Sequence, residues 1–201
     1  MNISGLHENL TEFNFGSSLT TIGYCAFLGC VGLTSIELPD NVTTLHSGAI
    51  FEDCGYISTF KFGKGITSYN SSWFNGDTRI GEFIVANDHP TYKTIDGVLF
   101  SKDETTLIAF PSGRSGSYTL PASTTSINSY AFAHSDALTE INVNEGIVDL
   151  TTGVFSGCGA ETINLPDSLE VINGYAFQYA NVKTINIGAN VDYIDSTAFY
   201  K

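Results

Sequence analysis

A pattern of apolar residues recurs every 22 to 24 residues along most of the chain, and this repetition constrains the fold more than any single residue does. The copy from Leu33 to Ile50 reads L-x-x-I-x-L-P-x-N-V-x-x-L-x-x-x-x-I. Eight residues occupy the first strand position of such a copy: Phe13, Ile36, Phe60, Phe83, Tyr118, Ile141, Ile163 and Ile185. A repeat this short cannot bury its own apolar face, so the copies are expected to stack around one shared core.

Each copy predicts one short strand, a corner and a coil. Alternating apolar residues such as Ile36 and Leu38 indicate a strand with one buried face. Turn-forming residues follow, then two apolar residues at spacing three, and then a small residue with a phenylalanine, as in Ala131-Phe132. We therefore expect a solenoid with a parallel sheet on one side, short coil or 3-10 turns on the other, and a stacked row of phenylalanines. In the copy from Ile36, Ile50 occupies the phenylalanine position.

The copy that begins at Phe83 is longer than the others and is predicted to remain incomplete. Apolar runs at 95–100 and 107–111 flank the polar segment 101–105, which predicts a β-hairpin insertion. The interrupted repeat, 86–117, is either a protruding contact element or a structural embellishment that replaces a missing alanine–phenylalanine coil. Because the period continues on both sides, we expect one solenoid domain of about eight repeats over residues 1–201.

The charge balance narrows the classes of partner. The net charge is −13 and the chain holds only eight Lys plus Arg residues. Nucleic acid is not expected as a partner, because phosphate binding needs clustered basic residues, and an anionic membrane surface is disfavoured for the same reason. No apolar stretch is long enough to span a bilayer, so no membrane insertion is expected in this chain. The pattern starts and stops abruptly, and a signal or an anchor is therefore expected outside this sequence.

The residues that usually carry chemistry do not form a recognisable motif. Cys30, Cys54 and Cys158 share one position of the repeat. Cys30 and Cys54 fall in consecutive copies, where a disulfide is within reach, and buried free thiols are the alternative. No zinc, calcium, phosphate-loop or nucleophile motif is present, although Asp103 and Glu104 offer a weak calcium candidate. We predict no catalytic residue, no metal site and no cofactor.

The histidines occupy unrelated positions of the repeat, whereas three tyrosines share the region just before the phenylalanine. The four histidines occupy different phases, so each is expected to be a solvent-exposed loop residue: His7, His46, His89 and His134. Tyr24, Tyr130 and Tyr175 come just before a phenylalanine. These rim tyrosines are expected to pack against neighbouring coils, with partner contact as the other reading.

The exposed side of the strands is the candidate binding face, because it lines the concave side of a curved solenoid. It is flat, neutral to acidic, and made mostly of hydroxyls and amides. Its residues are Glu12, Asn14, Ser35, Glu37, Thr59, Lys61, Glu82, Thr119, Glu140, Asn142, Thr162, Asn164, Thr184 and Asn186. Three asparagines in register are alternatively a side-chain ladder that stabilises the sheet.

The repeat resembles the BspA-like type of leucine-rich repeat, whose units read L-T-S-I-x-L-P-x-S-V-T-x-I-G-x-x-A-F-x-x-C. The segment 33–42, L-T-S-I-E-L-P-D-N-V, matches it closely, and so do A-F-L-G-C at 26–30 and V-F-S-G-C at 154–158. The cysteine position holds Ser135 and Ala180 in two copies. The resemblance covers nearly the whole chain and implies a leucine-rich-repeat solenoid of a cell-surface or secreted protein, with adhesion or recognition of host proteins and no catalysis.

Two functions of different classes therefore stand side by side. The first is a non-enzymatic binding or adhesion module that recognises an extracellular matrix or cell-surface protein, with a glycan as a further candidate partner. The second is a structural stalk that holds another domain away from the surface and has no ligand of its own.

Overall fold

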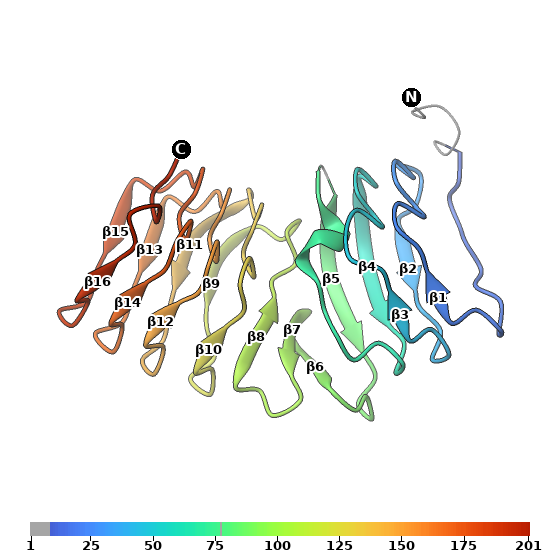
Figure 1. Cartoon of the computed structure of the whole chain (residues 1–201), viewed down its shortest axis with the longest axis horizontal. Helices are drawn as coiled ribbons and strands as arrows, with labels where there is room; N and C mark the ends of the chain where they lie inside the picture. The colour runs from blue at the N-terminus through green and yellow to red at the C-terminus, as the bar shows by residue number, and fades with distance from the viewer. Residues whose placement is uncertain (1–8, 77) are drawn as a thin grey trace. The chain divides into compact units, whose positions relative to one another are not determined.

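The structure is a computed structural model of the chain and describes residues 9–76 and 78–201. His7 lies outside the described residues. The chain divides into two compact units, unit 1 with residues 1–102 and unit 2 with residues 103–201. Each unit is a stack of short parallel strands linked by turns, with almost no helix (Figure 1). Each is therefore a solenoid of the leucine-rich-repeat type, as predicted, whereas a single domain over 1–201 remains a prediction.

Unit 1 contains two sets of parallel strands. The larger sheet has the order β2 (Ser35–Glu37), β4 (Tyr56–Phe62) and β5 (Arg79–Val85), and it places Ile36 opposite Phe60 and Phe60 opposite Phe83. The smaller pair joins β1 (Thr21–Ile22) to β3 (Thr44–Leu45). One 3-10 turn, η1 (Ser71–Phe74), starts at Asn70, whose side chain accepts a hydrogen bond from the Ser72 N–H. The predicted strand positions of unit 1 are thus confirmed from Ile36 onward.

The hairpin of the insertion has its turn at Asp96-Gly97. Strands β6 (Tyr92–Ile95) and β7 (Val98–Ser101) pair antiparallel across it, and both turn residues have positive φ, 48° and 74°. An Asp-Gly pair fits such a two-residue turn because Asp and Gly adopt left-handed backbone at low cost. A hairpin insertion is therefore present, but the expected continuous run 95–100 is interrupted by this turn.

Unit 2 contains a long sheet whose register follows the predicted strand positions. Its order is β9 (Gly116–Thr119), β11 (Leu138–Asn142), β13 (Thr162–Asn164) and β15 (Thr184–Asn186). Tyr118, Ile141, Ile163 and Ile185 lie opposite one another along it, and all four strands are parallel. Because alternate residues point to opposite faces, this register buries Ile141 and Ile163 fully and leaves Ile185, on the last strand, half-buried.

A second ladder of very short strands, where coil was expected, also runs along unit 2. Strand β8 (Thr106–Ala109) pairs with β10 (Ser126–Ile127), and a separate ladder joins β12 (Asp149–Leu150), β14 (Val171–Ile172) and β16 (Tyr193–Ile194). Each strand holds the last apolar residue before the alanine–phenylalanine pair, such as Ile127 or Leu150. Apart from the four residues of β8, each copy contributes two residues, which carry too little alternation to be read as a strand from sequence.

Phenylalanine rings form a row through the core of each unit, as the repeat predicted. In unit 2 the ring centroids of Phe132 and Phe155 are 5.4 Å apart, those of Phe155 and Phe177 are 5.4 Å apart, and those of Phe177 and Phe199 are 5.0 Å apart. Phe132 and Phe155 are fully buried. The row supplies a large share of the apolar surface that each copy removes from water.

The row also corrects two predictions. In unit 1, Phe51 rather than Ile50 stacks between Phe27 and Phe74, at 5.3 Å and 5.7 Å, because this copy is one residue longer before its phenylalanine. In unit 2, Phe110 stacks on Phe132 at 5.1 Å. The interrupted repeat therefore does have an alanine–phenylalanine coil, at Ala109-Phe110.

Truncating the row at a central ring should destabilise the fold strongly. Phe155→Ala removes a fully buried ring with a ring neighbour on each side, and we expect a loss of about 3–5 kcal/mol in the free energy of unfolding. Phe199→Ala is the matched control, because that ring is 48% exposed and should cost much less. Chemical denaturation followed by circular dichroism measures both; equal losses would contradict the buried row.

Candidate functional site

The candidate binding face of unit 2 consists of two polar rows on the exposed side of its long sheet. One row runs Ser117, Glu140, Thr162 and Thr184, and the other runs Thr119, Asn142, Asn164 and Asn186. The strand pairing places the members of each row directly opposite one another, so neighbours are about 4.8 Å apart. The sequence-predicted residues of this unit are therefore brought together on one surface.

Hydrogen bonds join the asparagines of that surface into a ladder. Asn186 Nδ2 donates to Asn164 Oδ1 at 2.6 Å, and Asn164 Nδ2 donates to Asn142 Oδ1 at 2.7 Å. Asn142 Nδ2 reaches Thr119 Oγ1 at 3.4 Å, and Asn164 also donates to Glu140 Oε1 at 3.1 Å. The side-chain ladder considered from the sequence is thus confirmed. These amides use some of their donors and acceptors in hydrogen bonds to one another, and the bonds restrict the side chains of the face.

The corresponding face of unit 1 carries charges rather than amides. Lys61 Nζ donates to Glu37 Oε1 across neighbouring strands, while Ser35, Thr59 and Glu82 line up in the adjacent row. Glu82 lies against the hairpin turn, because a Cβ on Gly97 would meet the Glu82 Cβ at 2.8 Å. The Phe83 N–H also donates to the Gly97 carbonyl at 2.8 Å. The insertion therefore borders the row at β5.

Glu12 and Asn14 do not belong to a strand, contrary to the prediction. The segment around Phe13 is irregular, and Asn14 Nδ2 donates to Glu12 Oε1 at 3.1 Å within that segment. The Phe13 ring is 44% exposed, although it packs edge-on against Phe27 at 5.0 Å. The copy that begins at Phe13 thus contacts the core through its ring, although its backbone does not pair with the sheet. Glu12 and Asn14 are therefore loop residues, and their membership of the candidate face remains a prediction.

The four cysteines are free thiols, which favours the thiol alternative over the disulfide. Cys54 Sγ donates to the Phe27 carbonyl at 3.0 Å, and burial raises the pKa of Cys54 to about 12. Burial likewise raises the pKa of Cys158 to about 11 and that of Cys30 above its ordinary value. Within the described residues, no three acidic, histidine or cysteine side chains gather into a metal-binding group. These thiols therefore act as packing groups.

His89 is fully buried, so the prediction of a solvent-exposed residue is wrong at this position. Its Nδ1 accepts hydrogen bonds from the N–H groups of Thr91 and Tyr92 at 3.2 and 3.1 Å. Nε2 must then carry the proton, and it donates to the Gly63 carbonyl at 3.3 Å. Burial is the main cause that lowers the pKa of His89, with Lys102 acting in the same direction and Asp40 opposing it. The neutral ring fastens the segment before β6 to the corner after β4.

A set of aromatic side chains on the coil opposite the sheet includes the predicted rim tyrosines Tyr130 and Tyr175 together with His134 and Tyr179, which were not predicted to join them. Tyr130, Tyr175, His134 and Tyr179 lie two residues before or after a core phenylalanine, and all four have φ between 54° and 60°. Such left-handed backbone is unusual for large side chains and costs on the order of 1–3 kcal/mol. The signal available in the sequence was the glycine that fills the same positions in other copies, as at Gly153 and Gly157.

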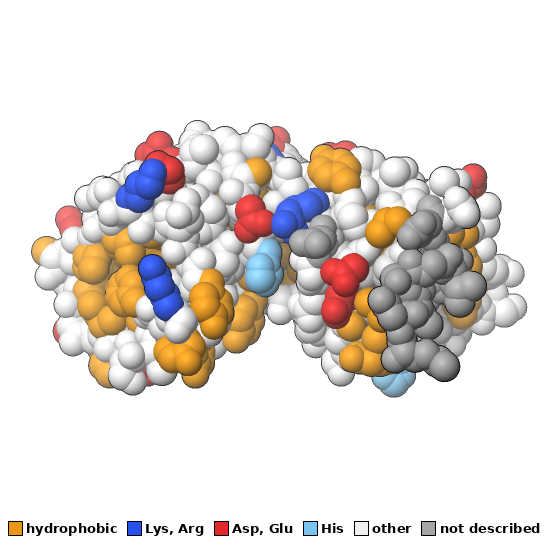
Figure 2. Space-filling view, turned by 90° about the horizontal axis from the view of Figure 1, so that it is seen from above, with side chains coloured by type: hydrophobic (Ala, Val, Ile, Leu, Met, Phe, Trp, Pro, Cys, Tyr) orange, Lys and Arg blue, Asp and Glu red, His pale blue; other side chains and the backbone are white. Residues whose placement is uncertain are grey.

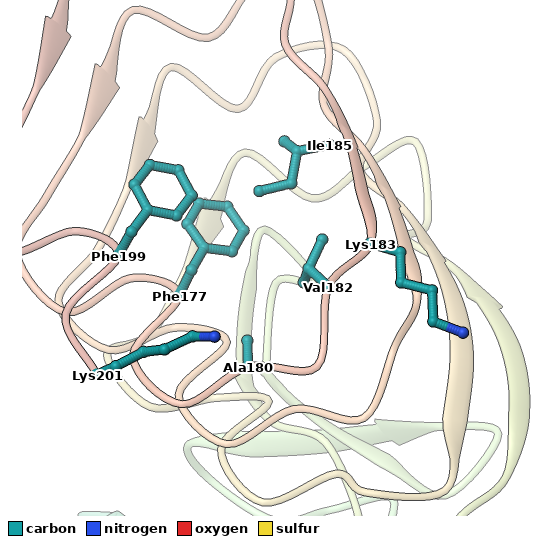
Figure 3. A pocket seen from close by; sticks show the side chains of 7 residues that line it. All are labelled: Phe177, Ala180, Val182, Lys183, Ile185, Phe199 and Lys201. Atoms are coloured by element: carbon teal, nitrogen blue, oxygen red, sulfur yellow. The ribbon is translucent and has the colours of Figure 1, made fainter.

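A small pocket lies in the C-terminal part of unit 2, beside β15. Its volume is about 340 Å³, and the rings of Phe177 and Phe199 lie side by side on one wall (Figure 3). The lining residues are Phe177, Ala180, Val182, Lys183, Ile185, Phe199 and Lys201. The Lys183 amine points away from the rings and pairs with Glu161 at 2.6 Å. The lining contains no carboxylate or histidine to act as a base, and the pocket is the open end of the apolar core.

The stacked strands, the phenylalanine row and the polar strand face define a leucine-rich-repeat protein. A family model described as the BspA type leucine rich repeat region, with six copies, matches residues 6–115 and 108–201. The chain belongs to this family, as the repeat predicted. The family and the fold are generally non-enzymatic and support a protein-interaction module of a surface protein.

Two solved structures give further points of comparison. The pneumococcal vaccine antigen PcpA is 27% identical with a TM-score of 0.73, and the match covers 93% of this chain and 53% of that chain. A leucine-rich repeat protein from Bacteroides ovatus is 20% identical with a TM-score of 0.48, covering 90% and 50% of the two chains. The chain thus spans about half the length of both. A comparison with curated proteins found no match.

Among the described residues, no helix has the length and apolar character needed to cross a membrane. The observation agrees with strands and turns as the main elements of both units.

The buried histidine predicts a pH-dependent stability of unit 1. Because the pKa of His89 is lower in the folded chain than its ordinary value near 6.5, the unfolded chain takes up the proton first. The contribution of His89 is therefore complete above about pH 6.5 and declines as the pH falls below it. We expect the stability difference between the parent chain and His89→Gln to shrink from pH 7.5 to pH 5.5, measured by urea denaturation. A difference independent of pH would exclude this linkage. His46→Gln is the control, because His46 is exposed.

The thiols predict a clear difference in reactivity. Cys25 is half-buried, whereas Cys30, Cys54 and Cys158 are buried with raised pKa values. In the folded protein at pH 8, a thiol-specific reagent should modify Cys25 rapidly and the other three only after unfolding. Peptide mass mapping after a short exposure identifies the modified residue. Rapid labelling of Cys54 or Cys158 would show that these sites open readily.

Proposed function

We propose that the chain is a non-enzymatic binding module of a cell-surface or secreted protein, and that it adheres to a host or neighbouring-cell protein through the strand face. The observation that carries this proposal is the alignment of Glu140, Thr162 and Thr184 beside the asparagine ladder on one exposed sheet surface. Membership of the BspA type family supports the same reading. The partner class is an extracellular matrix or cell-surface protein.

The chemistry of the face implies weak contacts that are repeated many times. In unit 2 its rows consist of hydroxyls, amides and one carboxylate, without the Trp, Tyr or Arg anchors that dominate tight interfaces. Single contacts of this kind are weak, because each polar group must give up water before it binds. Display of many molecules on one surface converts weak contacts into stable attachment.

The proposal is tested with the purified chain displayed on beads and exposed to immobilised fibronectin, fibrinogen, laminin and collagen. Saturable capture, competed by soluble chain, is the expected result for at least one protein. Thr119→Arg and Thr184→Arg place bulky charged side chains on the exposed face and should reduce capture about ten-fold or more. Ser126→Arg is the matched control, because Ser126 is exposed on the second ladder. Equal capture by all three variants would reject the strand face as the site.

A structural stalk is the second candidate, and the asparagine ladder favours it. Asn142, Asn164 and Asn186 already bond to one another, so part of the face is satisfied without any partner. A stalk predicts a cooperatively unfolding chain that captures none of the immobilised proteins even at high bead valency. That result would replace the adhesion proposal with the stalk.

A further inference from the structure

The coil edge of unit 2 carries a surface that the proposed function does not use. We define this edge as the three segments around Phe132, Phe155 and Phe177, residues 128–135, 151–158 and 173–180. Each segment bonds to the next through its backbone: the N–H of Tyr130 donates to Thr152 O at 3.2 Å, and that of Gly153 donates to Gly174 O at 3.1 Å. The same pattern recurs at His134, whose N–H donates to Ser156 O at 2.9 Å. The edge is therefore a rigid platform.

The aromatic side chains on this platform are held in strained backbone. Tyr130 and Tyr175 have φ of 60° and 59°, and Tyr179 has φ of 54°. The copy between them holds Gly153 and Gly157 at the equivalent positions, with φ of 62° and 65°. Glycine relieves this strain, so a large side chain here is unfavourable for the backbone. Backbone strain that is kept at an exposed aromatic ring indicates a functional role for that ring, because the ring does not stabilise its own backbone conformation.

The two glycines also make room for the rings of the preceding copy. A Cβ on Gly153 would lie 2.2 Å from the Tyr130 ring, and a Cβ on Gly157 would lie 2.9 Å from the His134 ring. Both rings therefore rest over the backbone of the next copy. Tyr130, Tyr175 and Tyr179 remain 39%, 38% and 63% exposed. The packing expected for the rim tyrosines is present at Tyr130, and it leaves ring surface accessible.

Carboxylates border the segments that hold these rings. Asp149 accepts a hydrogen bond from Asn173 Nδ2 at 2.8 Å, and Asp195 Oδ1 would lie 3.3 Å from a Cβ on Gly174. The three segments contain no Asp, Glu, Lys or Arg, in a chain whose net charge is −13. Seen from above, hydrophobic side chains gather over the C-terminal copies of unit 2, with a basic side chain among them (Figure 2). The same segments also supply hydroxyl and amide side chains, at Ser129, Thr152 and Gln178. With no Lys or Arg in the segments and carboxylates at their border, the edge offers no charge complementarity to a polyanion.

We propose that the coil edge of unit 2 binds a neutral glycan. A pyranose ring has an apolar face of C–H groups and a rim of hydroxyls, which match an exposed phenol ring on segments that also supply hydroxyl and amide groups. Tyr130 and Tyr175 are two copies apart, which is roughly 10 Å at the strand spacing. The two rings can therefore contact different sugar units of one extended oligosaccharide. Tyr179 adds a third ring in the same copy as Tyr175. The site is separate from the strand face and does not rest on the adhesion proposal.

The test uses the full chain and a panel of neutral hexasaccharides of glucose, mannose, xylose and N-acetylglucosamine, measured by isothermal titration calorimetry and on a multivalent array. At least one sugar should bind, and Tyr179→Gly and Tyr175→Gly should each weaken it about ten-fold or more. Glycine suits the left-handed backbone, so the thermal midpoint should stay close to that of the parent chain. Tyr179→Phe keeps the ring and should retain most of the binding.

Two controls separate this site from other surfaces. Tyr193→Ala removes an exposed tyrosine of β16, outside the coil edge, and Thr184→Arg alters the strand face; both should leave sugar binding unchanged. Absence of binding to every neutral sugar on the multivalent array overturns the proposal. Binding that survives both glycine variants, or that is confined to anionic polysaccharides, overturns it as well.

Discussion

The hydrogen bond between the backbones of successive copies is the interaction on which the rest of this structure depends. It occurs along the long sheet, along the second ladder, and again in the coil, where the Phe132 N–H donates to the Val154 carbonyl at 2.9 Å and the Phe155 N–H to the Ala176 carbonyl at 2.8 Å. Each copy is thereby held at one strand spacing from the next on every side of the coil. The phenylalanine rings stack because the backbone has already placed them about 5 Å apart.

Much of the fold was predictable because the apolar period is strong, and the failures have physical causes. Phe51 was missed because a one-residue insertion shifts the phase, which only the ring contacts with Phe27 and Phe74 reveal. Ala109-Phe110 was read as part of a hairpin because the insertion conceals its place in the repeat. The burial of His89 was not predicted because its ring is held by backbone groups of Gly63, Thr91 and Tyr92. Backbone groups are present at every residue, so the sequence pattern does not indicate such hydrogen bonds.

The two candidate sites differ in how much of their structure could be predicted from the sequence. The rows through Asn142, Asn164 and Asn186 follow directly from strand alternation, so their alignment was predictable, although their hydrogen bonds were not. The coil edge was not predictable as a group, because its defining property is a positive φ shared by Tyr130, Tyr175 and two glycines. Residue types alone give no reason to place a tyrosine and a glycine in the same class. The spacing from the core phenylalanine shows that they occupy equivalent positions, and the backbone conformation shows why both residue types occur there.

The asparagine ladder has a direction. Each amide group donates toward the preceding copy, from Asn186 to Asn164 to Asn142 and on to Thr119, so the side-chain dipoles point the same way and add along the stack. The two ends of the row are consequently unequal: the β9 end terminates in a hydroxyl, and the β15 end presents the Oδ1 acceptor of Asn186. A strand that pairs beside β15 would therefore bond best if it carried a hydrogen-bond donor opposite Asn186. The direction of the ladder thus favours some side chains over others at that position.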